Sequence, residues 1–179
     1  MRLNGTLCSV RRWTADDVES LVRHADNVNI ARQLRDRFPH PYTRASAIAF
    51  LKHSTVGDPP TSLAIEVDRQ AVGGIGYVTG SDVERYSAEV GYWLSEQYWG
   101  RGIVTEALVL VTNYAFDERN LLRLFALPFA DNAGSTRVLE KAGYVCEGIL
   151  RSSSVKYGQP RDQAMYARVN PAWNGPPSS

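Results

Sequence analysis

The chain has 179 residues, of which 44% are hydrophobic and 22% charged, and its net charge is +1. This length fits one domain, and the composition excludes a disordered chain or a fibrous repeat. The near-neutral charge argues against a surface for nucleic acid or an anionic membrane, and no apolar run approaches membrane-spanning length. We expect one domain over residues 1–170, followed by a flexible tail over 171–179 that is rich in Pro, Gly and Ser.

The first third of the chain predicts one strand and three helices. Apolar residues at helical spacing indicate the helices, and prolines end the second of them. The expected elements are a strand over 6–12, a helix over 15–25 with Thr14 before it, a short helix within 27–42, and a helix over 45–52 capped by Thr43.

The remainder of the chain begins with β-like runs and then mixes strands with helices. Strands are expected over 62–67 and 71–80, joined by a hairpin, and over 88–95. A long helix follows Gly102, then an apolar strand over 121–129, a helix over 133–142 that ends at Gly143, and strands over 144–150 and 162–169. This order favours an α+β layered fold.

Two glycines, Gly100 and Gly102, separate the strand over 88–95 from the long helix. A helix that begins there leaves the N–H groups of its first turn without partners and adds partial positive charge. Glycines would let a pyrophosphate reach those groups. The segment has neither the Lys-Ser/Thr of a P-loop nor the GxGxxG spacing. Taken alone, such a turn is more often structural than ligand-binding.

The wider sequence resembles the GNAT acyltransferase superfamily, whose pyrophosphate loop has the pattern Q/R-x-x-G-x-G/A. The matching phrases are AEVGYWLSEQYWGRGIVTEAL and DNAGSTRVLEKAGYVCEGILR, which are most similar to ribosomal-protein alanine and serine N-terminal acetyltransferases of the RimJ and RimL type. The resemblance covers residues 6–169. It implies a GNAT fold, with a mixed, mostly antiparallel twisted sheet, about four flanking helices, and two strands that splay apart around the cofactor.

By this resemblance the cosubstrate is acetyl-coenzyme A (acetyl-CoA), and the amides of the glycine loop hold its pyrophosphate. The strand that ends near Leu94 is expected to splay from the strand over 121–129, with the pantetheine arm between them as an added strand. Arg101 is explained equally well as a solvated loop cation. The expected cofactor-binding residues are Leu94, Gln97, Gly100, Arg101, Gly102, Ile103, Val104, Asn132 and Ser135.

Acetyl transfer to an amine needs a neutral amine, a stabilised oxyanion and a proton for the departing thiolate. A peptide α-amine, with a pKa of about 8, needs only a modest base, whereas a lysine amine at about 10.4 needs more help. Glu89 lies in an apolar strand and is the candidate general base, acting through water; a structural carboxylate that holds a nearby Arg is the equal alternative. By alternation, Glu89 and Trp93 face one side of the strand and Tyr92 the other.

Ser135 is the candidate general acid. Many members of the superfamily have a tyrosine where this chain has Leu139, but the RimJ and RimL type has a serine at the place of Ser135, with a proposed role in protonating the thiolate. The alternative is a serine that satisfies a backbone amide at a helix start. The same branch has a glutamate where this chain has Ser154, and this departure leaves the general base and the acceptor open.

The resemblance implies that the segment over 27–42 forms one side of the acceptor cleft. The acceptor is a primary amine, either a protein N-terminal α-amine or a small molecule, and the basic run RQLRDRF favours one that is not a polycation. A non-catalytic coenzyme A sensor or partner-binding module is the alternative function. Homodimer formation stays open. The expected substrate-contacting residues are Arg32, Phe38, Tyr42 and Tyr92, with Arg35 beside them.

No metal site is expected, because the three histidines and two cysteines lack ligand spacing. His24 is assigned to the surface or a loop, and Cys146 to the core of an apolar strand. Cys8 and Cys146 lie far apart in the sequence and are expected to be reduced thiols, which favours a cytoplasmic protein.

Overall fold

The computed structural model describes residues 1–58 and 60–176, which form one eight-stranded sheet with helices on both faces. The spatial order is β1-β2-β3-β4-β5-β6-β8-β7. Neighbours are antiparallel except β5 and β6, which run parallel. The strands are β1 (Arg2–Asn4), β2 (Ser9–Arg12), β3 (Ser62–Val67), β4 (Gln70–Thr79), β5 (Ser87–Leu94), β6 (Arg123–Ala126), β7 (Val145–Lys156) and β8 (Gln159–Val169).

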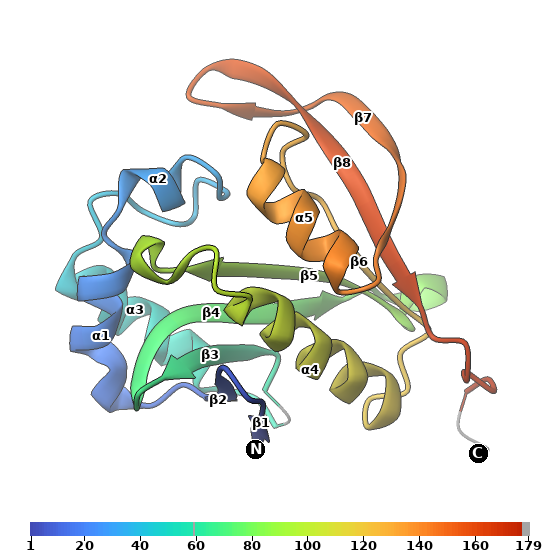
Figure 1. The fold of residues 1–179 in the computed structure, drawn as a ribbon, viewed down its shortest axis with the longest axis horizontal. Helices are drawn as coiled ribbons and strands as arrows, with labels where there is room; N and C mark the ends of the chain where they lie inside the picture. The colour runs from blue at the N-terminus through green and yellow to red at the C-terminus, as the bar shows by residue number, and fades with distance from the viewer. Residues whose placement is uncertain (59, 177–179) are drawn as a thin grey trace.

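The helices divide between the two faces of the sheet, with α4 in front and α3 behind in Figure 1. One face carries a core that includes Trp13, Leu21 and Leu51, under α1 and α3. The other carries a larger core that includes Leu108 and Leu139, under α4 and α5. The α-helices are α1 (Val18–Ala25), α2 (Val28–Ala31), α3 (Arg44–Ser54), α4 (Ile103–Asp117) and α5 (Ala133–Lys141). The expected α+β class is confirmed.

Strand β5 separates the two cores, and its side chains alternate as the sequence predicts. It pairs with β4 in unbroken register from Ala88 to Leu94. Val90 and Leu94 lie in the larger core under α4, whereas Trp93 packs against the smaller core under α1 and α3. Glu89 therefore faces the α1 and α3 side, and Tyr92 faces the α4 and α5 side.

Four strand predictions have the wrong ends. The strand expected over 6–12 is instead the turn and second strand of a hairpin of β1 and β2. The turn of this hairpin is held by Glu106, about one hundred residues away, which the sequence did not reveal. The strand expected over 121–129 is only Arg123–Ala126, because Pro128 has no N–H group and Phe129 makes only an isolated bridge to Gln163. The last two strands are longer than expected and meet at Tyr157 and Gly158, both with positive φ.

The prediction that Cys146 lies in the core is wrong, because β7 is the outermost strand of the sheet. Cys146 is exposed, as are nearly all residues of β7. The apolar sequence of this strand therefore does not report burial in this chain.

The expected C-terminal tail is described as far as residue 176, and residues 177–179 lie outside the described part. The Trp173 ring lies 5.5 Å from that of Tyr86, and its indole N–H donates to the carbonyl of Asn120 at 3.2 Å. The Asn120 side chain in turn donates to the carbonyl of Gly175 at 3.1 Å. These contacts attach residues 173–175 to the body of the domain.

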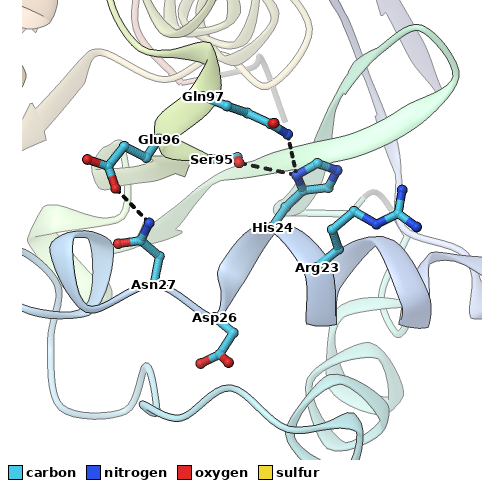
Figure 2. A pocket seen from close by; sticks show the side chains of 7 residues that line it. All are labelled: Arg23, His24, Asp26, Asn27, Ser95, Glu96 and Gln97. Carbon is cyan, nitrogen blue, oxygen red and sulfur yellow. Dashed lines mark hydrogen bonds between the residues drawn. The ribbon is translucent and has the colours of Figure 1, made fainter.

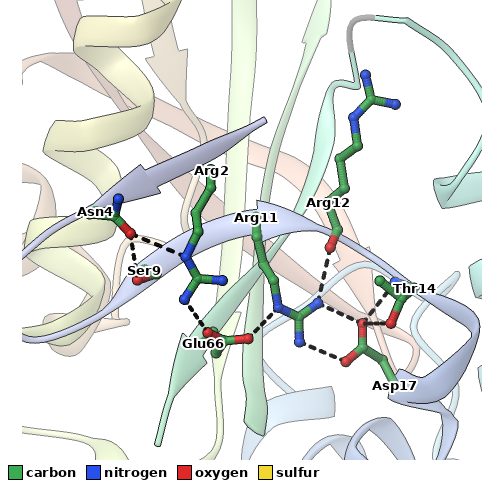
Figure 3. Close-up of polar contacts among 8 residues, drawn as sticks. All are labelled: Arg2, Asn4, Ser9, Arg11, Arg12, Thr14, Asp17 and Glu66. Atoms are coloured by element: carbon green, nitrogen blue, oxygen red, sulfur yellow. Dashed lines mark hydrogen bonds and ion pairs between the residues drawn. The ribbon is translucent and has the colours of Figure 1, made fainter. Parts of the chain in front are cut away.

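A buried charge network joins β2, β3 and the turn before α1 (Figure 3). Arg11 donates two hydrogen bonds of 2.8 Å to the carboxylate of Asp17, and its Nε pairs with Glu66. Asp17 is only 5% exposed and also accepts from the Thr14 amide at 2.8 Å. Burial would raise the pKa of Asp17 and of Glu66, but the hydrogen bonds and charges around them, from Arg11 and Thr14 at Asp17 and from Arg11 and Arg2 at Glu66, together outweigh it and lower both.

We predict that Arg11→Met lowers the free energy of unfolding by about 3–5 kcal/mol, because it leaves a buried carboxylate without its cation. Urea denaturation at pH 7 measures this. Arg12→Met is the matched control, since Arg12 pairs with the exposed Asp58, and it should cost less than about 1 kcal/mol. Equal effects of the two substitutions would contradict the role of Arg11.

The same network predicts acid sensitivity. The folded pKa values of Asp17 and Glu66 lie below the ordinary values of 3.8 and 4.5, so their stabilisation is complete above those ordinary values. It is lost as the pH falls through the folded pKa values. The stability gap between the wild type and Arg11→Met should therefore narrow in acid.

Candidate active site

The strands β5 and β6 separate after a short paired stretch. They are paired only from Ser87, opposite Arg123, to Glu89, opposite Phe125. Residues 90–94 of β5 have no partner on β6, and this half of β5 borders a gap in the sheet. The predicted splay is confirmed, and Glu89 stands at the last pair before the strands part.

The glycine loop follows this open half of β5 and leads into α4. Gly100 and Gly102 have φ of +75° and +80°, the left-handed region that favours glycine. Gly102 is the N-cap of α4 and makes no side-chain capping bond. Within residues 1–58 and 60–176, the amides of residues 101–105 have no protein acceptor. A Cβ added at Gly100 would meet no atom within 4 Å. The start of α4 is thus open to a ligand.

The nearest carboxylate on α4, that of Glu106, is occupied elsewhere. It accepts hydrogen bonds from the amides of Thr6, Leu7 and Cys8 at 2.8, 2.7 and 3.0 Å. Burial would raise the pKa of Glu106, but these three amides lower it overall. The β1–β2 turn therefore holds Glu106, and the acid does not cap the free amides of its own helix.

Ser135 lies in the first turn of α5 and meets a tyrosine from β5. Its Oγ is 2.8 Å from the phenol oxygen of Tyr92, which also lies 3.3 Å from the Ser135 carbonyl. The side chain that caps α5 is that of Asn132, which accepts from the Ser135 amide at 3.1 Å. The serine hydroxyl is therefore free of the capping role that sequence reasoning gave as its alternative.

Glu89 lies on the opposite face and pairs with Arg35, from the loop between α2 and α3. The Glu89 side chain is 31% exposed and that of Arg35 56%, so water reaches the pair. This contact is the Arg partner that the structural alternative for Glu89 anticipates. It does not remove the carboxylate from the site, because Glu89 still stands where β5 and β6 separate.

Two of the other residues expected to contact an acceptor, Phe38 and Tyr42, lie on the face of the sheet that Glu89 faces. Phe38 packs against Tyr42 and Trp93, at ring distances of 5.2 and 5.6 Å. Tyr42 is 4% exposed, and burial raises its pKa to about 12, so it stays neutral beside Phe38. Arg32 ends α2, and Tyr92 lies away from this group, on the other face.

A cavity of about 600 Å³ separates the loop between α2 and α3 from the tip of the β7–β8 hairpin. Lys156 reaches across it, and its side chain, 4% exposed, donates to Asp36 at 2.8 Å. Ser154, which stands at the position of the family glutamate, bonds to the carbonyl of Arg161 at 3.2 Å. It supplies no carboxylate to this cavity.

Gln97 and His24 meet beside the glycine loop, in a polar cavity of about 470 Å³ (Figure 2). Their side chains approach to 3.2 Å, and His24 also lies 3.2 Å from the hydroxyl of Ser95. His24 is 3% exposed, so its assignment to the surface is wrong. Burial lowers the pKa of His24, which favours the neutral imidazole.

Two further expected cofactor residues make contacts within the loop. Arg101 stacks over the ring of Tyr98 at 5.3 Å. The Leu94 side chain is buried, and its carbonyl accepts from the indole N–H of Trp99 at 2.8 Å. Sequence reasoning missed the His24, Trp99 and Tyr92–Ser135 contacts because each joins different elements; only the alternation of β5 pointed Tyr92 toward α5.

Within the described residues, no group of three or more His, Cys, Asp or Glu side chains is placed to hold a metal ion. None of the helices there combines the length and apolar character needed to cross a bilayer.

Comparison with known proteins finds acetyltransferases among the relatives of this chain. A probable N-acetyltransferase, YjcK of Bacillus subtilis, is 45% identical over 85 residues, which are 48% of this chain and 47% of that protein. The ribosomal-protein-serine acetyltransferase of Escherichia coli is 31% identical over 83 residues, 46% of each chain. The chain thus spans about half the length of these curated relatives.

Among solved structures, RimL, a ribosomal L7/L12 α-N-protein acetyltransferase in complex with coenzyme A, superposes with a TM-score of 0.84 at 18% identity. The superposition covers 94% of this chain and 98% of that one, and at this identity it shows the shared fold. The family described as the acetyltransferase (GNAT) domain matches residues 9–145, more than half of the chain. The chain therefore belongs to the GNAT acetyltransferase family.

Proposed function

We propose that this protein transfers the acetyl group of acetyl-CoA to a primary amine, by direct attack within a ternary complex. The observation that carries the proposal is the set of free amides over residues 101–105, at the start of α4 and beside the gap between β5 and β6. An anion-binding helix start next to an open strand edge suits a ligand with a pyrophosphate and an amide-bearing arm.

The cofactor would be held mainly by the backbone. The amides around Gly100, Arg101, Gly102, Ile103 and Val104 would bind the pyrophosphate, with Arg101 adding charge. The pantetheine arm would lie along the open half of β5, beside Leu94. Gln97 would position the loop through its contact with His24, and Asn132 would hold the start of α5 beside the reacting end.

The catalytic groups lie on opposite faces of β5, which suits a direct transfer. Glu89 faces the α1 and α3 side, from which the amine would approach, and would accept its proton through water. Ser135 faces the α4 and α5 side and would give a proton to the thiolate that leaves. Arg35 pairs with the Glu89 side chain on that side, where the pair is open to water.

The acceptor would enter the cavity between the loop of α2 and α3 and the β7–β8 tip. Among the described residues that line it, Asp36 is the carboxylate, and Lys156 already neutralises it. A cavity whose carboxylate is already neutralised by a lysine does not suit a polycationic acceptor. Phe38 lines this cavity, and Arg32 follows Ala31, which also lines it. The ribosomal-protein-serine acetyltransferase relative supports a protein N-terminal α-amine ahead of a small-molecule amine.

We predict that Gly100→Ala weakens coenzyme A binding at least tenfold, because a Cβ at the loop blocks close approach of the pyrophosphate to the backbone. Isothermal titration calorimetry measures the change. Gly158→Ala is the matched control: Gly158 has the same φ of +75°, has no atom within 4 Å of an added Cβ, and lies at the β7–β8 turn. Both substitutions carry the same backbone strain, of order 1 kcal/mol. Equal affinities of the two folded variants would remove the loop from the site.

The catalytic proposal is tested by release of free thiol from acetyl-CoA with a panel of peptides and small amines. Turnover should appear with at least one acceptor and should fall about 100-fold in Ser135→Ala, with coenzyme A affinity unchanged. The loss of activity caused by Glu89→Gln should be greatest below a pH of about 8, where the amine is largely protonated. Coenzyme A binding without turnover on any acceptor would favour the sensor or partner-binding function instead.

We also propose that two copies pair through the free edge of β7. This strand is the last of the sheet and carries exposed apolar side chains, Val145, Ile149, Leu150 and Val155. Such an edge invites pairing with another strand. Light scattering should give the mass of a dimer for the wild type and of a monomer for Ile149→Lys; a monomeric wild type would contradict the pairing.

The free thiols of Cys8 and Cys146 support a reducing, cytoplasmic location. Fractionation of native cells would test this proposal, and recovery from an oxidising compartment would contradict it.

A further inference from the structure

The contact between Tyr92 and Ser135 has a consequence for the reaction. A serine hydroxyl is a weak acid, and its hydrogen can rotate to any acceptor nearby. In the described part of the chain, the hydrogen-bond partner of the Ser135 Oγ is the Tyr92 phenol, at 2.8 Å. We infer that Tyr92 is a positioning residue, which donates to the Ser135 Oγ and thereby directs the serine hydrogen toward the departing sulfur. This inference rests on the proposed acetyl transfer.

The phenol is suited to donate. Burial raises the pKa of Tyr92 well above its ordinary value, more than the hydrogen bond with Ser135 lowers it, so the phenol keeps its proton at neutral pH. Its hydrogen can reach the Oγ at 2.8 Å or the Ser135 carbonyl at 3.3 Å, and the shorter contact favours the Oγ.

The serine backbone is fixed independently of Tyr92. The Asn132 side chain accepts from the Ser135 amide at 3.1 Å, so the first turn of α5 keeps its cap when the phenol is removed. Tyr92 belongs to residues 90–94 of β5, the half without a partner on β6. The hydroxyl pair therefore stands beside the gap in which the thioester would lie.

The proton balance is complete without any further reactant. The amine nitrogen forms a bond to the thioester carbon, and the carbon–sulfur bond then breaks, with the electron pair going to sulfur. Sulfur takes the hydrogen of Ser135, and the serine oxygen takes the phenol hydrogen through the 2.8 Å contact. The proton that the amine loses returns to the phenol through solvent, so the products are an amide and a free thiol.

The chain supplies a matched control in the same core. Tyr144 and Thr112 form a second buried tyrosine–hydroxyl pair, also at 2.8 Å; Thr112 belongs to α4, and Tyr144 lies in the larger core under that helix. Tyr144→Phe removes the same phenol group from a similar environment but leaves Ser135 untouched. It therefore measures what the loss of a buried tyrosine hydroxyl does to folding alone.

The experiment compares Tyr92→Phe, Ser135→Ala, the double variant and Tyr144→Phe by thiol release from acetyl-CoA, with thermal unfolding in parallel. Tyr92→Phe should lower kcat about tenfold and change the KM for acetyl-CoA less than twofold. The double variant should be no slower than Ser135→Ala, because the phenol acts only through the serine. Tyr144→Phe should lower the unfolding temperature as Tyr92→Phe does and keep the wild-type kcat.

Two results would overturn the inference while the proposed function stands: a kcat for Tyr92→Phe equal to that of Tyr144→Phe, or losses that multiply in the double variant. A wild-type protein that binds coenzyme A and turns over no acceptor would overturn both.

Discussion

The structure depends on unpaired backbone groups at the point where β5 leaves β6. Buried N–H and C=O groups almost always find partners in a folded chain. Here the pairing of β5 with β6 stops at Glu89, and beyond the end of β5 the amides of residues 101–105 stand free at the start of α4. Two sets of open backbone groups thus adjoin each other. A ligand with a diphosphate and an amide-bearing arm completes both, and this complementarity carries our assignment of the site.

The rest of the domain keeps this opening in place. Glu106 would otherwise offer a carboxylate close to the free amides, but it is held by three amides of the β1–β2 turn. His24, on α1, supports the loop through its contacts with Ser95 and Gln97. On the larger core, α4 is anchored by residues such as Leu108 and Val111. The alternation of β5 then separates the proposed base and acid onto opposite faces.

Local signals in the sequence predicted much of this arrangement. The glycine loop, the alternation of β5 and the helix after Gly102 follow from spacing over a few residues, and the splayed strands followed from the resemblance. What could not be predicted are contacts between distant elements. Glu106 meets Thr6, Arg35 meets Glu89, and Lys156 reaches Asp36 across 120 residues. No periodicity reports such pairs, because they depend on how the sheet is assembled.

The same limit explains two errors about burial. His24 carries a polar side chain, yet it is buried, because Ser95 and Gln97 arrive from another element to bond it. Cys146 lies in an apolar run but is exposed, because β7 has no strand beyond it. In both cases the neighbouring elements, and not the residue type, determined whether the side chain is buried.

The most direct test of the central claim is a crystal structure of the protein with bound coenzyme A. Our account predicts that the pyrophosphate oxygens lie within hydrogen-bond distance of the amides of residues 101–105, with the pantetheine arm along residues 90–94 of β5. A cofactor bound elsewhere, or a helix start capped by the protein's own side chains in that complex, would contradict it.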